Sequence, residues 1–480
     1  MRTKKSRYLT TTLPYVNASP HMGHALEFVQ ADTVARYLRI KGDEVFFNVG
    51  VDEHGQKISQ KADSSGMSRQ EYIDKYAKEF NKLKEALDLS YDSFVRTSSD
   101  KHKIAVREIW RICDSAGDIY KKKYKGLYCV GCEAFKTESD LVDGKCPDHQ
   151  IEPEELEEEN YFFRLSNYQD YLIEYLSKED SVIPNFRRLE ALDFVKKGLE
   201  DLSISREKSR MDWGIEVPGD DKHVVYVWFD ALTNYISCLD WPEDKNGNFL
   251  KFWEQGQTLQ FAGKDQVRFQ SIIWQAMLKS AQIKATDKIF YHGFINSGGQ
   301  KMSKSIGNVI DPYDLVERYG TDGTRYLMLR HVHPTDDSDL TWDKMDEWYT
   351  ANLVNGIGNL TARIMKMAES NLSQPVELGV SDVFDMEIST AMDTFDFQSA
   401  TDKIWKKIQT VDEKITITEP FKMVKTDRRG EAIKIIEELV AELSIIAGML
   451  APFMPQTSVL IQDSIAENKM PEKLFTRLDS

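Results

Sequence analysis

Two short segments of the chain place histidines and lysines where a phosphate group could be held. The first is His21-Met-Gly-His24, in which Gly23 would let a ligand approach the backbone closely. The threonine-rich Tyr8–Leu13 predicts a strand before it, and apolar residues at helical spacing over Ala25–Ile40 predict a helix after it. We therefore expect both histidines at a helix N-terminus, where unpaired N–H groups and partial positive charge favour an anion.

The second segment is Lys301-Met-Ser-Lys304-Ser, which has turn-forming residues on both sides, glycines among them. Such flanks predict a mobile loop. Two lysines among serines are ordinarily a solvated loop, and two turn histidines are ordinarily surface residues. Together the segments are far more specific than either one, because His21 and His24 would hold a nucleotide phosphate while Lys301 and Lys304 clamp the remaining triphosphate oxygens.

Four residues in the middle of the chain have the spacing of two metal-binding knuckles, namely Cys129, Cys132, Cys146 and His149. Each pair fits on one tight turn, and two such turns brought together complete a tetrahedral Cys3His site for Zn2+. The alternative is a set of unrelated cysteines and a histidine, which the paired spacing disfavours. No fifth ligand or catalytic carboxylate is apparent nearby, so the prediction is a closed structural site.

Two aspartates follow predicted strands. Asp52 comes directly after Glu44–Val51, and Asp265 comes after Thr258–Ala262 with Gly263 between them. The carboxyl ends of parallel strands meet at one edge of an open α/β sheet, and this edge is where such sheets bind ligands. A helix cap is the alternative role for each aspartate.

The order of predicted elements indicates an α/β fold with an insert. Strand and helix patterns alternate up to about residue 115, which predicts a βαβ unit. The alternation stops between about 118 and 225, where the acidic run Glu152–Glu159 is interpreted as a solvated loop. Predicted strands at His223–Phe229 and Lys288–Phe294 then resume the pattern.

The C-terminal part is predicted to be a bundle of helices. Beyond about Trp342 there are no convincing strands, and two apolar stripes occur at helical spacing, one over Leu353, Ile357, Leu360 and Ile364 and another within Glu431–Leu450. Asn359 and Arg363 are four residues apart and therefore share a helix face. By residue type alone they would be a solvent-exposed polar pair.

Length, composition and net charge limit the classes of protein to which the chain can belong. The 480 residues are too many for a single compact core. No run of about 18 apolar residues occurs, and the N-terminal MRTKKSR leads into a predicted strand, so a soluble cytoplasmic protein with no membrane partner is expected. The net charge of −16 has the wrong sign for a protein that binds a polyanion, so an RNA ligand would have to bind at a local basic face.

Several longer segments resemble a known family. HMGH and KMSKS resemble the two signatures of class I aminoacyl-tRNA synthetases. PYVNASPHMGH, VDEHGQKI, YCVGCEAFKTESDLV, ENYFFRLS and YVWFDALTNYI resemble the methionyl-tRNA synthetase family, in its bacterial type with one zinc knuckle. The resemblance runs through nearly the whole chain. It implies a Rossmann-type parallel sheet split by a zinc-binding insert and followed by an α-helical anticodon-binding bundle, with boundaries at 1–117, 118–225, 226–300, 301–345 and 346–480.

The resemblance also implies an activity. The expected reaction activates L-methionine with ATP and Mg2+ to methionyl-adenylate and then transfers methionine to the 3′ end of its tRNA, tRNA(Met), with Zn2+ as a structural ion. The implied ATP-binding residues are His21, Gly23, His24, Gly263, Asp265, Lys301 and Lys304, of which the two histidines and two lysines are catalytic. The implied methionine-binding residues are Leu13, Tyr15, Asp52, Trp228, Ala231, Leu232, Tyr235, Gln270 and Trp274. Anticodon bases would be read by Asn359, Arg363 and Phe421.

Two residues depart from the family pattern. Gln270 stands where the family commonly has histidine, and Phe421 stands where it has tryptophan. A glutamine still donates and accepts hydrogen bonds, and a phenylalanine still stacks on a base with less area. The alternatives are a non-catalytic RNA-binding relative and a ligase for another amino acid, such as cysteine. The additional C-terminal module of some relatives is missing from the chain, so a monomer is expected.

Overall fold

The computed structural model describes residues 4–129, 134–136, 138–147, 150–301, 309–378 and 383–478. The chain divides into two compact units. The first unit consists of Met1–Pro20, Gly42–Lys82 and Tyr91–His292, and the second consists of His21–Lys41, Leu83–Ser90 and Gly293–Ser480. Helix α3 (Arg69–Ala86) contributes residues to both.

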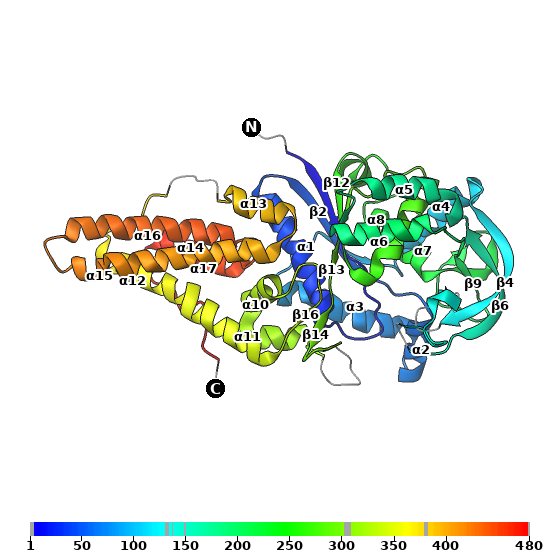
Figure 1. Cartoon of the computed structure of the whole chain (residues 1–480), viewed down its shortest axis with the longest axis horizontal. Coiled ribbons are helices and arrows are strands. Elements are labelled where there is room, and N and C mark those ends of the chain that lie inside the picture. Colours follow the sequence, from blue (N-terminus) through cyan, green and yellow to red (C-terminus); the bar gives the residue numbers. More distant parts are fainter. Residues whose placement is uncertain are drawn as a thin grey trace. The chain divides into compact units, whose positions relative to one another are not determined.

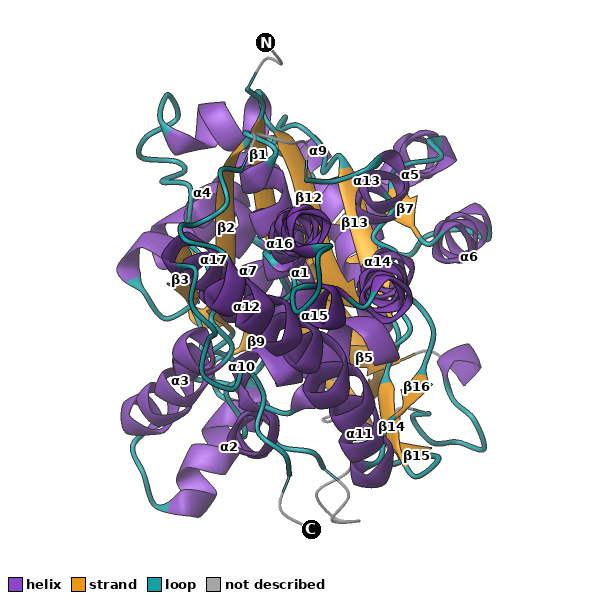
Figure 2. Cartoon of the chain, turned by 90° about the vertical axis from the view of Figure 1, so that its left-hand side faces the viewer, coloured by secondary structure: helices purple, strands orange, loops and turns teal. Residues whose placement is uncertain are grey.

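The first unit is built on a six-stranded sheet in the order β3-β2-β1-β12-β13-β7, in which every neighbouring pair is parallel (Figure 2). Its strands are β1 (Ser6–Thr10), β2 (Glu44–Val51), β3 (Ser93–Arg96), β7 (Val182–Ile183), β12 (Gln257–Gly263) and β13 (Lys288–His292). Chain order reverses between β1 and β12, and ligands bind at such a switch point, beyond the carboxyl ends of the strands. The predicted Rossmann-type sheet is confirmed.

Strand β2 has the predicted bounds, whereas β1 is shorter and earlier than the prediction. Glu44–Val51 is mostly buried, as expected of a strand with neighbours on both sides. The strand predicted at Tyr8–Leu13 begins at Ser6 and ends at Thr10, and Pro14 beyond it has no N–H to donate to a neighbouring strand. The carbonyl of Pro14 instead accepts a hydrogen bond of 2.9 Å from the Asp52 backbone N–H.

The core of the first unit is rich in large aromatic side chains. Tyr8, Trp253 and Trp274 are almost fully buried, with ring centroids 5.8 Å apart for Tyr8 and Trp253 and 6.0 Å apart for the two tryptophans. The first unit also contains the helices α2 (Gln56–Ser65), α4 (Asp100–Ser115), α5 (Gln169–Ser177), α6 (Asn185–Lys196), α7 (Val227–Leu232), α8 (Asn234–Ser237), α9 (Trp274–Ser280) and the short helices η1 (Glu138–Asp140), η2 (Leu165–Tyr168), η3 (Phe249–Glu254), η4 (Lys264–Gln266) and η5 (Phe269–Ile273).

The insert between the two halves of the sheet carries two small antiparallel sheets. One has the order β5-β4-β6-β8, from β5 (Ala134–Lys136), β4 (Ile119–Cys129), β6 (Glu154–Phe163) and β8 (Leu202–Ser203), and the other has the order β10-β11-β9, from β10 (Glu216–Val217), β11 (Asp220–Val225) and β9 (Ser205–Glu207). The insert also contributes β7 to the edge of the large sheet.

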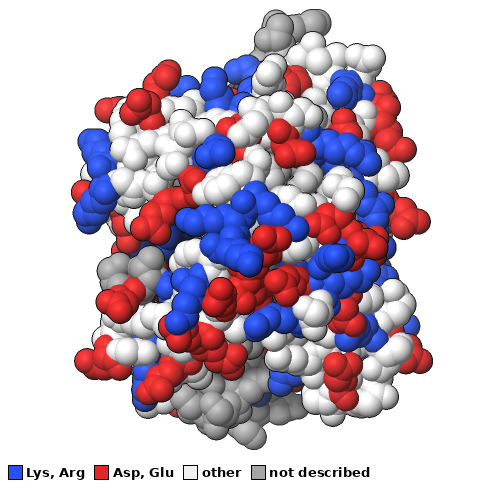
Figure 3. Space-filling model, turned by 90° about the vertical axis from the view of Figure 1, so that its right-hand side faces the viewer, with Lys and Arg blue, Asp and Glu red and all other residues white. Residues whose placement is uncertain are grey.

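Two sequence expectations for this region are wrong. From Glu154 onward the acidic run is not a loop but part of β6, because its glutamates lie opposite the lysines of β4, with ion pairs such as Lys121–Glu159 at 3.3 Å and Lys125–Glu155 at 2.8 Å. Basic and acidic side chains accordingly lie next to one another over the face shown in Figure 3. The strand predicted at His223–Phe229 ends at Val225 and belongs to a small antiparallel sheet, and α7 begins at Val227.

The second unit is mainly helical. It contains α1 (Met22–Ile40), α10 (Pro312–His331), α11 (Trp342–Trp348), η6 (Tyr349–Gly358), α12 (Asn359–Asn371), α13 (Met386–Asp393), α14 (Phe397–Thr418), α15 (Pro420–Met423), α16 (Arg429–Leu450) and α17 (Pro455–Glu467), with the short strands β14 (Ile295–Ser297), β15 (Gln300–Lys301) and β16 (Ser338–Asp339). Helices α12, α14, α16 and α17 form a bundle (Figure 1).

The predicted apolar stripe faces the interior of this bundle, since Leu353, Ile357, Leu360 and Ile364 are all at most 1% exposed. The predicted helical bundle is therefore confirmed. Within the described residues, no helix combines the length and the apolar character needed to cross a membrane.

Candidate active site

Asp52 and Tyr15 are brought together at the carboxyl ends of β1 and β2 in the first unit. They form an isolated parallel bridge, and Asp52 is 1% exposed. One carboxylate oxygen of Asp52 lies 3.3 Å from the backbone nitrogen of His54 and 3.4 Å from the hydroxyl of Thr97, both of which donate to it. Asp52 does not cap a helix, because α2 begins at Gln56 with Gly55 before it. Its carboxylate can therefore hold a cationic group such as an α-amino group.

The expected pocket residues include two groups of packed aromatic rings, one of which contains Tyr15. The Trp228 ring meets Tyr15 edge to face, with centroids 6.1 Å apart, and stacks on Phe269 at 3.8 Å. The rings of Tyr235 and Trp274 are 5.7 Å apart. Among the other expected pocket residues, Ala231 and Leu232 are buried in α7, and Leu13 is half-buried in the loop after β1. Aromatic walls of this kind suit a flexible thioether side chain.

Phe269 and Gln270 lie in the π-helical turn η5, a distortion that often occurs at functional sites. Sequence reasoning missed Phe269, although its place next to Gln270 is a signal that could have found it. The Gln270 amide donates to the Tyr235 hydroxyl at 2.6 Å, and its carbonyl oxygen is buried with no partner among the described residues. That acceptor is a group which a bound ligand can satisfy.

A second buried carboxylate stands between the pocket residues of α7. Asp230 is fully buried, and its two oxygens lie 2.6 Å from Nδ1 of His54 and 2.7 Å from Nε2 of His102. Burial alone would raise the pKa of Asp230, but the two imidazoles beside it lower this pKa overall. Sequence reasoning missed this cluster, because its members come from three distant segments.

Gly263 and Asp265 lie at the carboxyl end of β12. A side-chain carbon at Gly263 would come within 2.7 Å of the exposed Asp265 carboxylate and would displace it from its present position. Asp265 is exposed, accepts a hydrogen bond of 2.7 Å from Gln266 and does not cap η4. It is therefore available to accept from the hydroxyl groups of a ligand.

In the second unit, His21 and His24 form a reciprocal cap at the start of α1. Nδ1 of His21 accepts from the Gly23 N–H at 3.1 Å, Nδ1 of His24 accepts from the His21 N–H at 3.3 Å, and the two rings stack at 3.7 Å. This cap starts the helix at Met22, so the prediction that both histidines lie at a helix N-terminus is confirmed. Because both Nδ1 atoms accept, each neutral ring carries its proton on Nε2, where it can donate to a phosphate oxygen.

The lysine-containing segment is described only in part. The backbone of Lys301 belongs to β15, which pairs with β14, while the Lys301 side chain and all of Lys304 lie outside the described residues. Their predicted role as clamps of the triphosphate stays a prediction.

Comparison with known proteins finds relatives from one family along nearly the whole chain. The family described as "tRNA synthetases class I (M)" matches residues 7–155 and 150–365. The methionine--tRNA ligase of Caldanaerobacter subterraneus is 40% identical over 99% of this chain and 74% of its own length, and that of Brucella suis is 39% identical over 96% and 92%. Mycobacterium tuberculosis methionyl-tRNA synthetase bound by methionyl-adenylate has a TM-score of 0.89 at 34% identity, covering 99% of both chains.

The chain belongs to the methionyl-tRNA synthetase family. The resemblance inferred from its motifs is thereby confirmed. An apo form of the Mycobacterium tuberculosis member is also similar, with a TM-score of 0.83 at 30% identity over the full length of both chains.

The predicted zinc knuckle falls partly outside the described residues. Cys132 and His149 are among the residues that are not described, so two of the four expected ligands have no structural account. Cys129 and Cys146 are both buried thiols outside any disulfide, which fits metal ligands. No cluster of three ligating side chains occurs among the residues that are described, and this set omits half of the expected site.

The expected anticodon-reading residues lie in the bundle of the second unit. Asn359 begins α12 and is exposed, and Arg363 one turn later forms an ion pair with Asp412 of α14. Phe421, in the short helix α15, is 42% exposed. An exposed amide and a ring of this kind can bind base edges and base faces, respectively.

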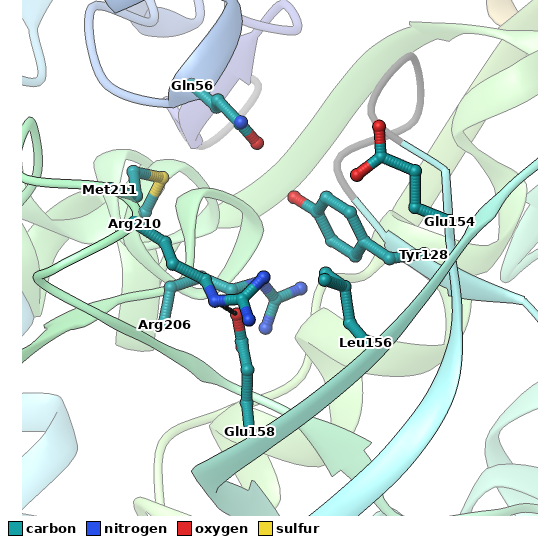
Figure 4. Close-up of a pocket in the computed structure, with 8 residues that line it drawn as sticks. All are labelled: Gln56, Tyr128, Glu154, Leu156, Glu158, Arg206, Arg210 and Met211. Carbon is teal, nitrogen blue, oxygen red and sulfur yellow. Dashed lines mark ion pairs between the residues drawn. The ribbon is translucent and has the colours of Figure 1, made fainter.

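The first unit also contains a cavity of about 230 Å³ that sequence reasoning did not predict (Figure 4). The guanidinium groups of Arg206 and Arg210 converge in it, and Arg210 pairs with Glu158 at 3.1 Å. Gln56, four residues after Asp52, forms part of the wall. Two guanidinium groups can hold an anionic group in bidentate fashion.

Proposed function

We propose that the chain ligates methionine to tRNA with ATP, through methionyl-adenylate. In the first step a carboxylate oxygen of methionine attacks the α-phosphorus of ATP, and the bond to the β-phosphate breaks to release pyrophosphate. In the second step a terminal hydroxyl of tRNA attacks the methionyl carbonyl, and AMP leaves. No protein nucleophile is needed in either step, so the protein acts by positioning and by stabilising phosphate charge.

The chain belongs to this family, and one observation on its structure supports the proposal. The buried carboxylate of Asp52 lies next to Tyr15, and Trp228 packs against the Tyr15 ring. This arrangement offers an anion to the methionine α-amino group and aromatic surface to its side chain. A thiol-specific pocket would instead need a metal beside Asp52, and the cysteines with ligand spacing are in the insert.

The phosphate chemistry is assigned to the second unit. The Nε2–H groups of His21 and His24 donate to the α-phosphate oxygens as negative charge develops there, and the N-terminus of α1 adds its partial positive charge. Lys301 and Lys304 neutralise the departing pyrophosphate. In the first unit, Asp265 accepts from the ribose hydroxyls where Gly263 lets the nucleotide approach.

Two metal ions complete the proposal. Mg2+ would be bound by the phosphates of ATP and would supply charge neutralisation there, and no protein carboxylate cluster is assigned to hold it. Zn2+ would be held by Cys129, Cys132, Cys146 and His149, and its chemistry is to cross-link the two knuckles of the insert. About one zinc per chain in elemental analysis is the expected result.

The tRNA is assigned to two parts of the chain. The proposed division has the nucleotide-binding domain at 1–117 and 226–300, the insert at 118–225, a stem-contact region at 301–345 and the anticodon-binding domain at 346–480. Asn359 and Arg363 read base edges and Phe421 stacks on a base, while the Asp412 carboxylate orients the Arg363 guanidinium.

The test is ATP–pyrophosphate exchange with each amino acid in turn. Exchange that depends on methionine alone is expected, followed by methionylation of tRNA(Met). Exchange driven by cysteine would assign a different ligase. A protein that supports exchange with no amino acid but binds tRNA would be the non-catalytic relative.

A further inference from the structure

The carboxylate of Asp230 is enclosed by side chains from three segments of the first unit. His54 comes from the loop after β2, and His102 comes from α4, while Asp230 itself belongs to α7. Asp230 is 0% exposed, His54 is 4% exposed and His102 is 1% exposed. The two oxygen–nitrogen distances of 2.6 and 2.7 Å are those of charge-assisted hydrogen bonds.

One of these hydrogen bonds leads directly to the predicted amino-acid site. The backbone N–H of His54 donates to the Asp52 carboxylate, so the imidazole bound to Asp230 and the carboxylate assigned to the α-amino group share one turn of chain. The Trp213 indole donates to the Glu53 carbonyl at 2.6 Å and holds the same turn from another side. The position of His54 therefore helps to orient the Asp52 carboxylate, which Thr97 also contacts.

The Asp230 end of the cluster belongs to the same helix as part of the aromatic wall of the predicted pocket. Asp230 lies two residues after Trp228 and directly before Ala231, with its side chain bound to the histidines. His102, on the far side of the carboxylate, has Ser237 of α8 at 2.9 Å from its Nδ1 atom. Three of the residues assigned to methionine, Trp228, Ala231 and Leu232, thus share a short helix with the carboxylate that binds His54.

The tautomers in this cluster are determined by the carboxylate. An ionised carboxylate only accepts, so His54 carries a proton on Nδ1 and His102 carries one on Nε2. An asparagine at position 230 would present one acceptor and one donor. One of the two imidazoles would then lose its bond or change tautomer, while the volume of the side chain stays the same.

We propose that Asp230 is a positioning residue, which fixes through His54 the separation between Asp52 and Trp228 and thereby sets the affinity for the amino acid. Asp230 touches no substrate in this account. The inference rests on the proposed function, since it takes Asp52 and Trp228 as the two ends of the methionine site. Its signature is a change in methionine binding without a matching change in ATP binding.

The test measures KM for methionine and for ATP in the pyrophosphate-exchange reaction of Asp230→Asn. We expect KM for methionine to rise about tenfold, the size of one lost charge-assisted hydrogen bond, with KM for ATP within about twofold of the starting protein. The matched control is Asp220→Asn, because Asp220 also binds a histidine, His223, at 2.9 Å but belongs to β11 of the insert. This control should leave both KM values unchanged.

Two further variants keep the inference falsifiable if Asp230→Asn does not fold. His54→Gln should raise KM for methionine, whereas His102→Gln should lower the thermal unfolding midpoint and leave KM for methionine within about twofold, because His102 does not bind the turn that carries Asp52. Equal effects of the two variants on KM would overturn the positioning role. Absence of methionine-dependent exchange in the unaltered protein would instead refute the proposed function.

Discussion

Each compact unit contains a buried carboxylate that holds an element of the candidate site, but the two carboxylates have different partners. In the first unit, Asp230 accepts from the imidazoles of His54 and His102. In the second, Asp32 of α1 binds the guanidinium groups of Arg325 and Arg36, each at 2.8 Å. Helix α1 begins at the two site histidines and α7 carries Trp228, so each carboxylate supports one half of the proposed chemistry.

The difference lies in how the partners respond to protons. Burial alone would raise the pKa of Asp32, but Arg325 and Arg36 lower it overall, and guanidinium groups stay charged at every ordinary pH. Imidazoles carry charge only when protonated, and their two nitrogens accept or donate according to tautomer. A permanent ion pair therefore suits a fixed scaffold, whereas the histidine pair gives a network whose geometry depends on which nitrogen holds the proton.

The largest effect is expected where the permanent ion pair is broken. Arg325 is fully buried and also donates to the carbonyls of Leu87, Pro452 and Phe453 at 2.9 to 3.0 Å. Arg325→Met should lower the free energy of unfolding by about 3–5 kcal/mol, because it leaves buried acceptors and a carboxylate with fewer partners. Urea denaturation measures this change.

A surface ion pair of the same unit is the control for Arg325. Arg318 pairs with Asp346 at 2.6 Å, but its side chain is 40% exposed. Arg318→Met should change the free energy of unfolding by about 1 kcal/mol or less. Similar losses for the two variants would contradict the contrast between buried and exposed pairs.

The next effect concerns the histidines at the start of α1. His24→Ala removes a predicted donor to the transition-state phosphate and should lower kcat for pyrophosphate exchange by about 10²–10³-fold. KM for methionine should stay unchanged, because the residues assigned to the amino acid belong to the first unit. A rise in KM for methionine with normal kcat would instead assign His24 to substrate binding and not to phosphate chemistry.

A histidine of the second unit should make stability depend on pH. Burial, together with the charge of Arg330, lowers the pKa of His331 to about 3, and its ring stacks on Trp348 at 4.0 Å. The unfolded chain binds a proton on His331 near pH 6.5, whereas the folded chain binds it only near pH 3. The folded state is therefore favoured fully above pH 6.5, and the free energy of unfolding falls as the pH is lowered from 6.5 towards 3.

His331→Phe keeps the stacked ring and removes the titration. Between pH 7 and pH 4.5 the starting protein should lose about 2–3 kcal/mol more unfolding free energy than the variant does. Urea denaturation at the two pH values gives the difference directly. Parallel losses in the two proteins would show that His331 does not titrate in this way.

The smallest effect is expected at Gln270. Gln270→His replaces one neutral donor to the Tyr235 hydroxyl by another, so KM for methionine should change by about fivefold or less, and methionine should remain the substrate of both proteins. A variant that used methionine while the starting protein did not would show that Gln270 had changed specificity. Exchange assays with both proteins separate these outcomes.

The fold class, the family and several elements could be predicted from the sequence. Strand β2 has its predicted bounds, and the apolar stripe from Leu353 to Ile364 is buried, because periodicity reports which side of a single element faces the core. The place of His21 and His24 at the N-terminus of α1 was also predicted, whereas the reciprocal cap that they form was not, because apolar spacing does not reveal side-chain hydrogen bonds.

Other features required the tertiary structure. The glutamates of β6 form a strand because the lysines of β4 lie opposite them, and a charge run by itself does not show its partner. The motifs at His21 and Lys301 and the aspartate after β2 are properties of the sequence alone, since short-range spacing specifies them. The cluster at Asp230 is decided only by packing, because its carboxylate is 176 residues from His54 and 128 residues from His102 along the chain.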